Sequence, residues 1–159
     1  MFILVGLDGK EILSIRNLSI SLCLVLIGQI RFTLGLRFIE MAKHLIFVYG
    51  TLKRGWGNNA IIHDQKFVDT AITSPDFQMY TLGGFPGVVL GDNHILGEVW
   101  EVDDVAFDRC DRLEGHPNFY KRKQIFVALD KNEELVEAWI YIYQGNVEGR
   151  QPIEEWTHG

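Results

Sequence analysis

One short segment of the sequence could hold an anion through its backbone. Residues 44–49 form a largely apolar run, which predicts a buried strand. Gly50, Thr51 and Leu52 follow it directly, and consecutive backbone N–H groups at the end of a strand can form a concave site for a carboxylate or a phosphate. The segment lacks the G-x-x-x-x-G-K-[ST] spacing of a nucleotide-binding P-loop. Taken alone, such a segment is more often an ordinary strand-to-helix turn.

Glu114 could exchange protons with a ligand. It lies in the last turn of a predicted helix that begins at Asp103 or Asp104 and stops at Gly115. The partial negative charge at a helix C-terminus disfavours a carboxylate, and partial burial acts in the same direction, so both raise its pKa. A carboxyl group that titrates nearer to neutral pH can both take and return a proton. The alternative interpretation is a surface glutamate at a helix end.

Aromatic side chains recur on one strand in the last third of the chain. Trp139, Tyr141 and Tyr143 share one face of the strand that is predicted over residues 135–143, because side chains alternate along a strand. Facing a cavity they could bind a polar ligand, whereas facing solvent they would be ordinary strand formers, which is the commoner arrangement. Phe85-Pro86-Gly87 likewise indicates a turn unless the fold places it at a pocket.

Many short strands and few helices must position these residues. A short helix is predicted over residues 60–63, with Asn58 or Asn59 as its N-cap. In a longer helix Ala106, Cys110 and Leu113 recur with helical spacing. The predicted strands cover residues 44–49, 66–73, 77–82, 88–90, 95–102, 120–129 and 135–143. This pattern predicts one α+β domain, with a small mixed or antiparallel β-barrel and one or two short helices.

The composition excludes several classes of protein. The 159 residues carry a net charge of −6 without a basic stripe, which argues against nucleic-acid binding. A hydrophobic share of 47% and a charged share of 23% exclude a disordered or collagen-like chain. Cys23 and Cys110 cannot form a disulfide scaffold, and the scarcity of cysteine fits a reducing cytosol. The histidines have no ligand spacing, so no metal site is predicted.

The first forty residues differ from the rest of the chain. Their most apolar run, residues 18–30, is shorter than the ~20 residues that span a bilayer, and no small-x-small cleavage site follows it. A strand is predicted directly after Met41. We therefore expect residues 1–40 to be an N-terminal extension, disordered or translated from a start codon upstream of the natural one, and residues 41–159 to be the domain. A membrane or export element and an added structural element are the alternatives.

Several of these segments together resemble the γ-glutamylcyclotransferase superfamily, in its γ-glutamylamine cyclotransferase-like branch, also called AIG2-like. The order and spacing of the matching pieces are more specific than any one piece, whereas residues 1–40 match nothing in the family. The pieces cover most of residues 44–143: Val48-Tyr49-Gly50-Thr51-Leu52-Lys53-Arg54-Gly55, Phe85-Pro86-Gly87, Gly97-Glu98-Val99-Trp100, Leu113-Glu114-Gly115 with Pro117 and Tyr120, and Ala138-Trp139-Ile140-Tyr141.

The resemblance implies a γ-glutamylcyclotransferase-like fold with a small β-barrel and a cavity. It also implies an enzyme that uses no metal and no organic cofactor. In the family's reaction the α-amino group of a γ-glutamyl compound attacks its own γ-carbonyl, the ring closes to 5-oxoproline, and the amine leaves. The ending Lys53-Arg54-Gly55 favours a γ-glutamylamine over glutathione as the small-molecule substrate.

The resemblance further implies roles for individual residues. Glu114 matches the catalytic glutamate, which takes a proton from the α-ammonium and later protonates the leaving amine. Backbone N–H groups after the first strand hold the α-carboxylate, and Phe85-Pro86 could form one wall of the pocket. The implied substrate-binding residues are Tyr49, Gly50, Thr51, Leu52, Tyr120 and Tyr141.

Two other functions stay open at this point. The same cavity could belong to a non-catalytic module that binds a small carboxylate. Glu114 argues against that function, because a bound anion gains nothing from a buried carboxylate. The other is attachment to a membrane through residues 18–30. We expect a cytoplasmic enzyme with a small-molecule substrate and with neither a nucleic-acid nor a membrane partner.

Overall fold

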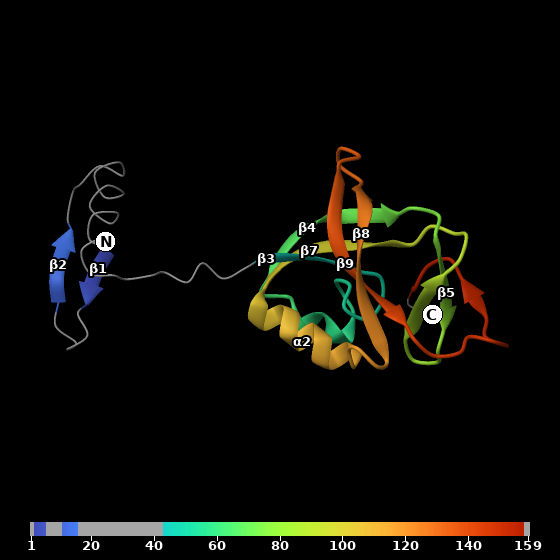
Figure 1. Ribbon diagram of the computed structural model, residues 1–159. Coiled ribbons are helices and arrows are strands. Elements are labelled where there is room, and N and C mark those ends of the chain that lie inside the picture. Colours follow the sequence, from blue (N-terminus) through green and yellow to red (C-terminus); the bar gives the residue numbers. More distant parts are fainter. Residues whose placement is uncertain (1, 6–10, 16–42, 158–159) are drawn as a thin grey trace. The chain divides into compact units, whose positions relative to one another are not determined.

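The computed structural model describes residues 2–5, 11–15 and 43–157 (Figure 1). The chain divides into two compact units, Met1–Glu40 and Met41–Gly159. In the first unit, β1 (Phe2–Val5) and β2 (Glu11–Ile15) pair as an antiparallel two-stranded sheet. Neither strand is among those predicted from the sequence. The apolar run of residues 18–30 lies outside the described residues.

Five strands of the second unit close into a barrel in the order β3-β7-β4-β8-β9. Neighbouring strands are antiparallel except for β3 and β9, which run parallel. The barrel is therefore mixed, and with its helix it confirms the predicted α+β class. The strands are β3 (Lys43–Val48), β4 (Lys66–Thr73), β7 (Leu96–Asp103), β8 (Tyr120–Leu129) and β9 (Leu135–Tyr143).

A second, three-stranded sheet lies beside the barrel, on the side where Figure 1 labels β5. It contains β5 (Phe77–Thr81), β6 (Pro86–Leu90) and β10 (Pro152–Ile153), in the order β10-β5-β6. The sequence predicts both β5 and β6, but β6 begins two residues earlier than predicted. The prediction of a turn is therefore wrong for Pro86 and Gly87, which pair with Thr81 and Tyr80 of β5. The two-residue β10 is not expected from the sequence, because its pairing with Met79 and Tyr80 spans about half of the second unit.

The apolar side chains form two cores on opposite faces of the barrel sheet. One core contains residues from all five barrel strands, such as Phe47, Val99 and Ile140, and therefore fills the barrel. The other lies between the outer face of the barrel and α2 (Asp104–Glu114), and contains Ile46 and Cys110. Because side chains alternate along β3, this strand is buried on both faces, which explains why its sequence is continuously apolar.

The ends of α2 follow from its sequence. Asp103 is the N-cap, and its Oδ1 accepts a hydrogen bond from the backbone N–H of Ala106 at 2.8 Å. Gly115 ends the helix in the left-handed conformation, with φ 61°. One expectation is wrong: Leu113 does not complete the buried stripe, since 38% of it is exposed. Its side chain lies outside the core between α2 and the barrel.

The predicted short helix is a 3₁₀ helix and lies three residues earlier, as η1 (Gly57–Ile61). Its N-cap is Trp56, and no side chain caps it. The prediction that Asn58 or Asn59 caps this helix is therefore wrong. Both asparagines lie inside η1 and donate hydrogen bonds back to the preceding loop instead.

We predict that a shortened chain beginning at Met41 folds by itself. The barrel, the small sheet and α2 are built entirely from Lys43 and later residues, because every strand pairing of the barrel lies there. Thermal unfolding of the shortened and full chains should give midpoints within a few degrees of each other. A shortened chain that lacks a cooperative transition, beside a full chain that has one, would make residues 1–40 part of the folded domain.

Candidate active site

A small cavity opens where β3, β6 and α2 come together. Its volume is about 160 Å³, below the ~300–1,000 Å³ of pockets for drug-sized ligands, so it suits a small metabolite. Segments that are far apart in the sequence meet there. All seven residues expected at the site lie among its lining residues: Tyr49, Gly50, Thr51, Leu52, Glu114, Tyr120 and Tyr141. Phe85 and Pro86 also line the cavity.

The loop after β3 presents backbone donors to the cavity. The N–H groups of Gly50, Thr51 and Leu52 make no hydrogen bond to any described residue. The loop is nevertheless turned back on itself, because the N–H of Lys53 donates to the Gly50 carbonyl at 3.0 Å. Unpaired N–H groups in a partly buried loop that lines a cavity favour an anionic partner. We call residues 50–52 the anion loop.

Two asparagines of η1 hold the anion loop in place. The Asn58 side-chain N–H₂ donates to the Thr51 hydroxyl at 2.9 Å, and that of Asn59 donates to the Leu52 carbonyl at 2.8 Å. Since the Thr51 oxygen accepts the Asn58 bond, its own O–H stays available as a donor. Asn58 also lines the cavity. The sequence signal for holding the loop is the Asn-Asn pair that follows Thr51 and Leu52 by seven residues. The same pair is also typical of a helix N-cap, which is the prediction made above.

A buried carboxylate anchors Arg54, two residues after the anion loop. Glu98, on β7, is only 8% exposed. It accepts hydrogen bonds from the Arg54 backbone N–H at 3.1 Å, from Arg54 Nε at 3.1 Å and from Trp100 Nε1 at 3.0 Å. Charge-assisted bonds of this kind are stronger than neutral ones. They tie the Lys53-Arg54-Gly55 end of the loop to the barrel wall.

Lys53 ties the same loop to the C-terminal segment. Its ammonium group donates to the Trp156 carbonyl at 3.0 Å and pairs with Glu155 at 3.3 Å. The ring of Trp156 lies 5.5 Å from that of Trp56, next to η1. These contacts cannot be predicted from local sequence, because about a hundred residues separate Lys53 from its partners.

Gly50 lies against the start of β6. A Cβ atom at this position would be 2.7 Å from Pro86 Cγ and 3.1 Å from Pro86 Cδ. Pro86 cannot move away freely, because its carbonyl accepts a hydrogen bond from the Tyr120 hydroxyl at 2.6 Å. Only glycine therefore fits at residue 50 without displacing a wall of the cavity.

The end of α2 determines the position of Glu114. The His116 N–H donates to the Asp111 carbonyl and the Gly115 N–H to the Arg112 carbonyl, which is the Schellman arrangement. Glu114 is the last helical residue and is half-buried. No hydrogen bond to its carboxyl group is present among residues 43–157. Burial raises its pKa to about 7, in the direction expected from the sequence and with burial as the cause.

Three tyrosines surround Glu114, and their hydroxyl groups are bonded to the protein. Tyr49 donates to the Tyr141 carbonyl at 2.6 Å, Tyr120 to the Pro86 carbonyl at 2.6 Å, and Tyr141 to Asp111 Oδ1 at 2.7 Å. Burial raises the pKa of all three phenols, and their proximity to Glu114 adds to the shift. The phenols therefore stay neutral, and their rings form the cavity walls.

Trp139, Tyr141 and Tyr143 share one face of β9, as predicted. The expectation that this face points to solvent is wrong, since all three pack into the core beneath α2. Asp111 is the polar partner there: besides Tyr141 it binds the Arg122 guanidinium, which lies over the rings of Phe107 and Trp139. The sequence did not reveal Asp111, which resembles an ordinary surface residue of an amphipathic helix.

Residues 46–158 match the family described as "Gamma-glutamyl cyclotransferase, AIG2-like". The chain belongs to this family. The gamma-glutamylcyclotransferase family protein YtfP of Escherichia coli K12 is 34% identical over 110 residues, which are 69% of this chain and 90% of that protein. A protein of Methanocaldococcus jannaschii, provisionally named a gamma-glutamylcyclotransferase, is 41% identical over 101 residues, 62% of this chain and 82% of its own length.

Solved structures agree with this assignment to the AIG2-like family. The crystal structure of a mouse AIG2-like protein is 25% identical in sequence and superimposes with a TM-score of 0.66. The similarity covers 72% of this chain and 88% of the mouse chain. The barrel with one helix is therefore the AIG2-like fold.

Neither a membrane-spanning helix nor a metal-binding cluster is present in the described part of the chain. No helix among these residues is long and apolar enough to span a membrane. Likewise, the described residues contain no group of three or more His, Cys, Asp or Glu side chains placed to hold a metal ion.

We predict that Glu114 lowers the stability of the protein as the pH rises. The ordinary pKa of a glutamate side chain is 4.5, and the pKa of Glu114 in the folded protein is about 7. Between these values the unfolded chain has lost the proton and the folded chain keeps it, so the free energy of unfolding falls with rising pH. Urea unfolding of Glu114→Gln and wild type at pH 5, 6, 7 and 8 should show the variant gaining relative stability up to about pH 7 and little beyond.

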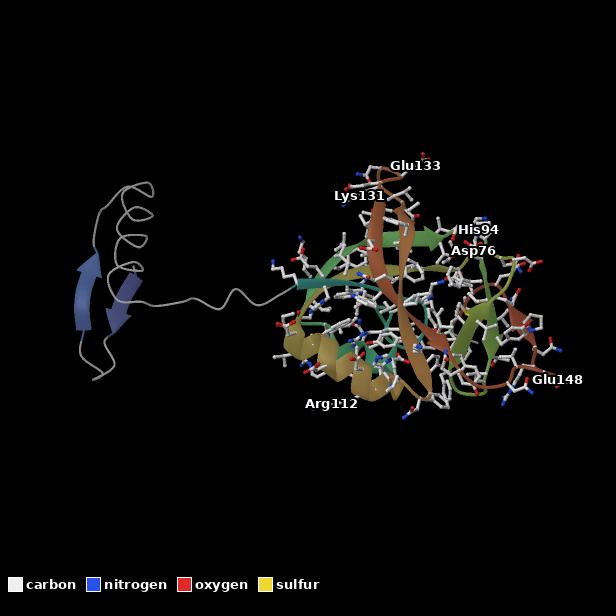
Figure 2. The ribbon with its side chains drawn as sticks, in the orientation of Figure 1. Asp76, His94, Arg112, Lys131, Glu133 and Glu148 are labelled. Atoms are coloured by element: carbon white, nitrogen blue, oxygen red, sulfur yellow. The ribbon has the colours of Figure 1, made fainter. Side chains whose placement is uncertain are left out.

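The control for this prediction is Glu148→Gln, which changes an exposed glutamate (labelled in Figure 2) that does not line the cavity. Its stability should follow the wild-type curve over the whole range. Parallel curves for Glu114→Gln and wild type would show that Glu114 ionises as readily in the folded protein as in the unfolded chain.

Proposed function

We propose that this protein converts a γ-glutamyl amine or amide into 5-oxoproline and the free amine. One observation carries the proposal: a half-buried carboxyl group with a pKa of about 7 has no hydrogen-bond partner among the described residues, and it shares a small cavity with backbone N–H groups that are unpaired within the same part of the chain. A γ-glutamyl group carries a carboxylate and an ammonium on the same carbon. The cavity offers a complementary group for each of them.

The glutamyl end of the substrate would bind first to the anion loop. Its α-carboxylate accepts hydrogen bonds from the N–H groups of Gly50, Thr51 and Leu52, and the free O–H of Thr51 can add another. The α-ammonium then lies toward Glu114, the only carboxyl group among the lining residues. The rings of Tyr49 and Tyr120 exclude water from the reacting atoms.

Glu114 moves the protons of the reaction. As a carboxylate it takes a proton from the α-ammonium, and the neutral nitrogen attacks the γ-carbonyl carbon to close a five-membered ring. The bond between that carbon and the leaving nitrogen then breaks, and the Glu114 carboxylic acid protonates the leaving nitrogen. Overall the α-nitrogen loses two protons and the amine gains two, so the charge of the substrate ammonium ends on the released amine. A pKa near 7 suits both steps.

Positioning supplies the rest of the rate enhancement. Because nucleophile and carbonyl belong to one molecule, the protein must select the conformer in which they touch. The anion loop is held by Asn58 and Asn59 on one side and by Glu98 and Lys53 on the other. Anchoring from both sides fixes the α-carbon, and the small cavity folds the γ-carbonyl back toward the amine.

An assay for 5-oxoproline release tests the proposal directly. The panel should contain γ-glutamyl amines, γ-glutamyl amino acids and glutathione, incubated with the full chain. Release from at least one γ-glutamyl amine supports the proposed function. If no member of the panel releases 5-oxoproline although 5-oxoproline itself binds, the protein is instead a non-catalytic module for small carboxylates.

We predict that Glu114→Gln lowers kcat by roughly 10²–10⁴, the usual contribution of a general acid–base group. Glutamine keeps the shape of glutamate but cannot accept the proton. Binding of 5-oxoproline, measured by calorimetry, should persist or strengthen, because the ligand carboxylate no longer faces a second one. The matched control is Asp108→Asn on the exposed side of the same helix, which should leave kcat unchanged. Normal turnover by folded Glu114→Gln would defeat this mechanism.

We predict that Gly50→Ala raises KM by roughly 10–100-fold, which corresponds to losing one hydrogen bond to a charged group. The added Cβ atom meets Pro86 at 2.7 Å, so the loop must shift away from the bound carboxylate. Gly57→Ala is the control, because a Cβ atom there meets nothing within 4 Å. Steady-state kinetics of both variants give the comparison. Equal KM values for the two variants would show that the anion loop does not bind the substrate.

A further inference from the structure

The mouth of the cavity is apolar. Three of its apolar lining residues are more than one third exposed, namely Phe85 (38%), Leu113 (38%) and Phe119 (45%). The other aromatic and aliphatic residues that line the cavity are almost completely buried. Whatever part of a ligand projects from the cavity toward solvent therefore packs against these three side chains, which we call the rim.

Contacts on several sides hold the rim in place. The ring of Phe119 lies 5.2 Å from Tyr120, 5.4 Å from Tyr143 and 6.0 Å from Phe85. Its backbone is bonded on both sides, since its N–H donates to the Gly115 carbonyl and its carbonyl accepts from the Gln144 N–H, both at 3.0 Å. A fixed apolar surface of this kind discriminates between ligands better than a mobile one.

None of the described residues that line the cavity carries a positive charge. Glu114 is the only charged residue among the described residues that line the cavity. Arg112, the neighbour of Leu113, is exposed and points away from the barrel on the outer side of α2 (Figure 2). Arg122 is engaged by Asp111. A carboxylate at the mouth would therefore face Glu114 without a counter-ion, which is unfavourable in a partly buried site.

The proposed reaction fixes which part of the substrate lies at the rim. The anion loop holds the α-carboxylate and Glu114 faces the α-ammonium, so the γ-carbonyl lies between them and the leaving amine points outward. We infer that the leaving amine carries an uncharged alkyl or aryl group, and that Phe85, Leu113 and Phe119 select it. This inference rests on the proposed function and names the substrate class within it.

Three probes of similar chain length test this inference with the full chain. They are the γ-glutamyl amides of n-butylamine, 4-aminobutyrate and 1,4-diaminobutane, which place a methyl, a carboxylate or an ammonium group at the rim. We expect kcat/KM for the butylamide to exceed that for the carboxylate probe by tenfold or more, the size of effect that apolar pockets produce. Aromatic rings also attract ammonium groups, so the third probe decides between an apolar rim and a cation-binding rim.

The outcomes separate this inference from the proposed function. The inference is overturned if kcat/KM for the carboxylate or the ammonium probe equals or exceeds that for the butylamide. The proposed function is then unaffected, because 5-oxoproline is still released. No release from any probe or from the wider γ-glutamyl panel overturns the proposed function, and the inference with it.

A charge placed at the rim gives a second, independent measurement. Phe119→Lys should raise the carboxylate-to-butylamide ratio of kcat/KM at least tenfold, because it supplies the missing counter-ion. Phe126→Lys is the matched control: Phe126 is an exposed phenylalanine of β8 that does not line the cavity, and its substitution should leave the ratio unchanged. Since Phe119 also packs on Tyr120, Leu113→Lys provides the same charge from α2. An unchanged ratio in both folded rim variants overturns the inference.

Discussion

Burial of β3 on both faces is the constraint on which the rest of the structure depends. Side chains such as Phe47 fill the barrel, those such as Ile46 pack beneath α2, and β7 and β9 flank the strand. The chain therefore leaves β3 in a fixed direction. A loop that starts from such a strand can keep three N–H groups unpaired, because its position does not depend on bonding them. Asn58, Asn59, Glu98 and Lys53 then hold the remainder of the loop.

The electrostatics of the cavity follow from what surrounds Glu114. Three neutral phenols and the walls of the cavity take water away from the carboxyl group, and none of the described residues gives it a hydrogen bond in return. The Schellman end of α2 prevents the residue from turning out to solvent. A protein that pays this cost in stability gains a group able to both accept and donate a proton near neutral pH. The γ-glutamylcyclotransferase family assignment agrees with that chemistry.

Local signals predicted the parts of the fold that depend on neighbouring residues. Asp103 and Gly115 mark the ends of α2, and the strands predicted over residues 120–129 and 135–143 have the observed limits of β8 and β9. Long-range contacts could not be found in this way. Asn58 has the local sequence of a helix cap but donates to Thr51. Glu98 lies in a predicted strand, and only the three-dimensional structure shows that it binds Arg54. Leu113 continued an apolar stripe by spacing, yet the end of the helix carries it to the cavity mouth.

The link between Lys53 and residues 155–156 has a consequence for synthesis of the protein on the ribosome. Residues 50–52 emerge early, and η1 can fold against them soon afterwards. The acceptors of the Lys53 ammonium are translated about a hundred residues later, and β9, which flanks β3, also comes late. In a nascent chain η1 can therefore form before the contacts that hold residues 50–53 are complete. The cavity therefore reaches its final form only near the completion of translation of residues 41–159.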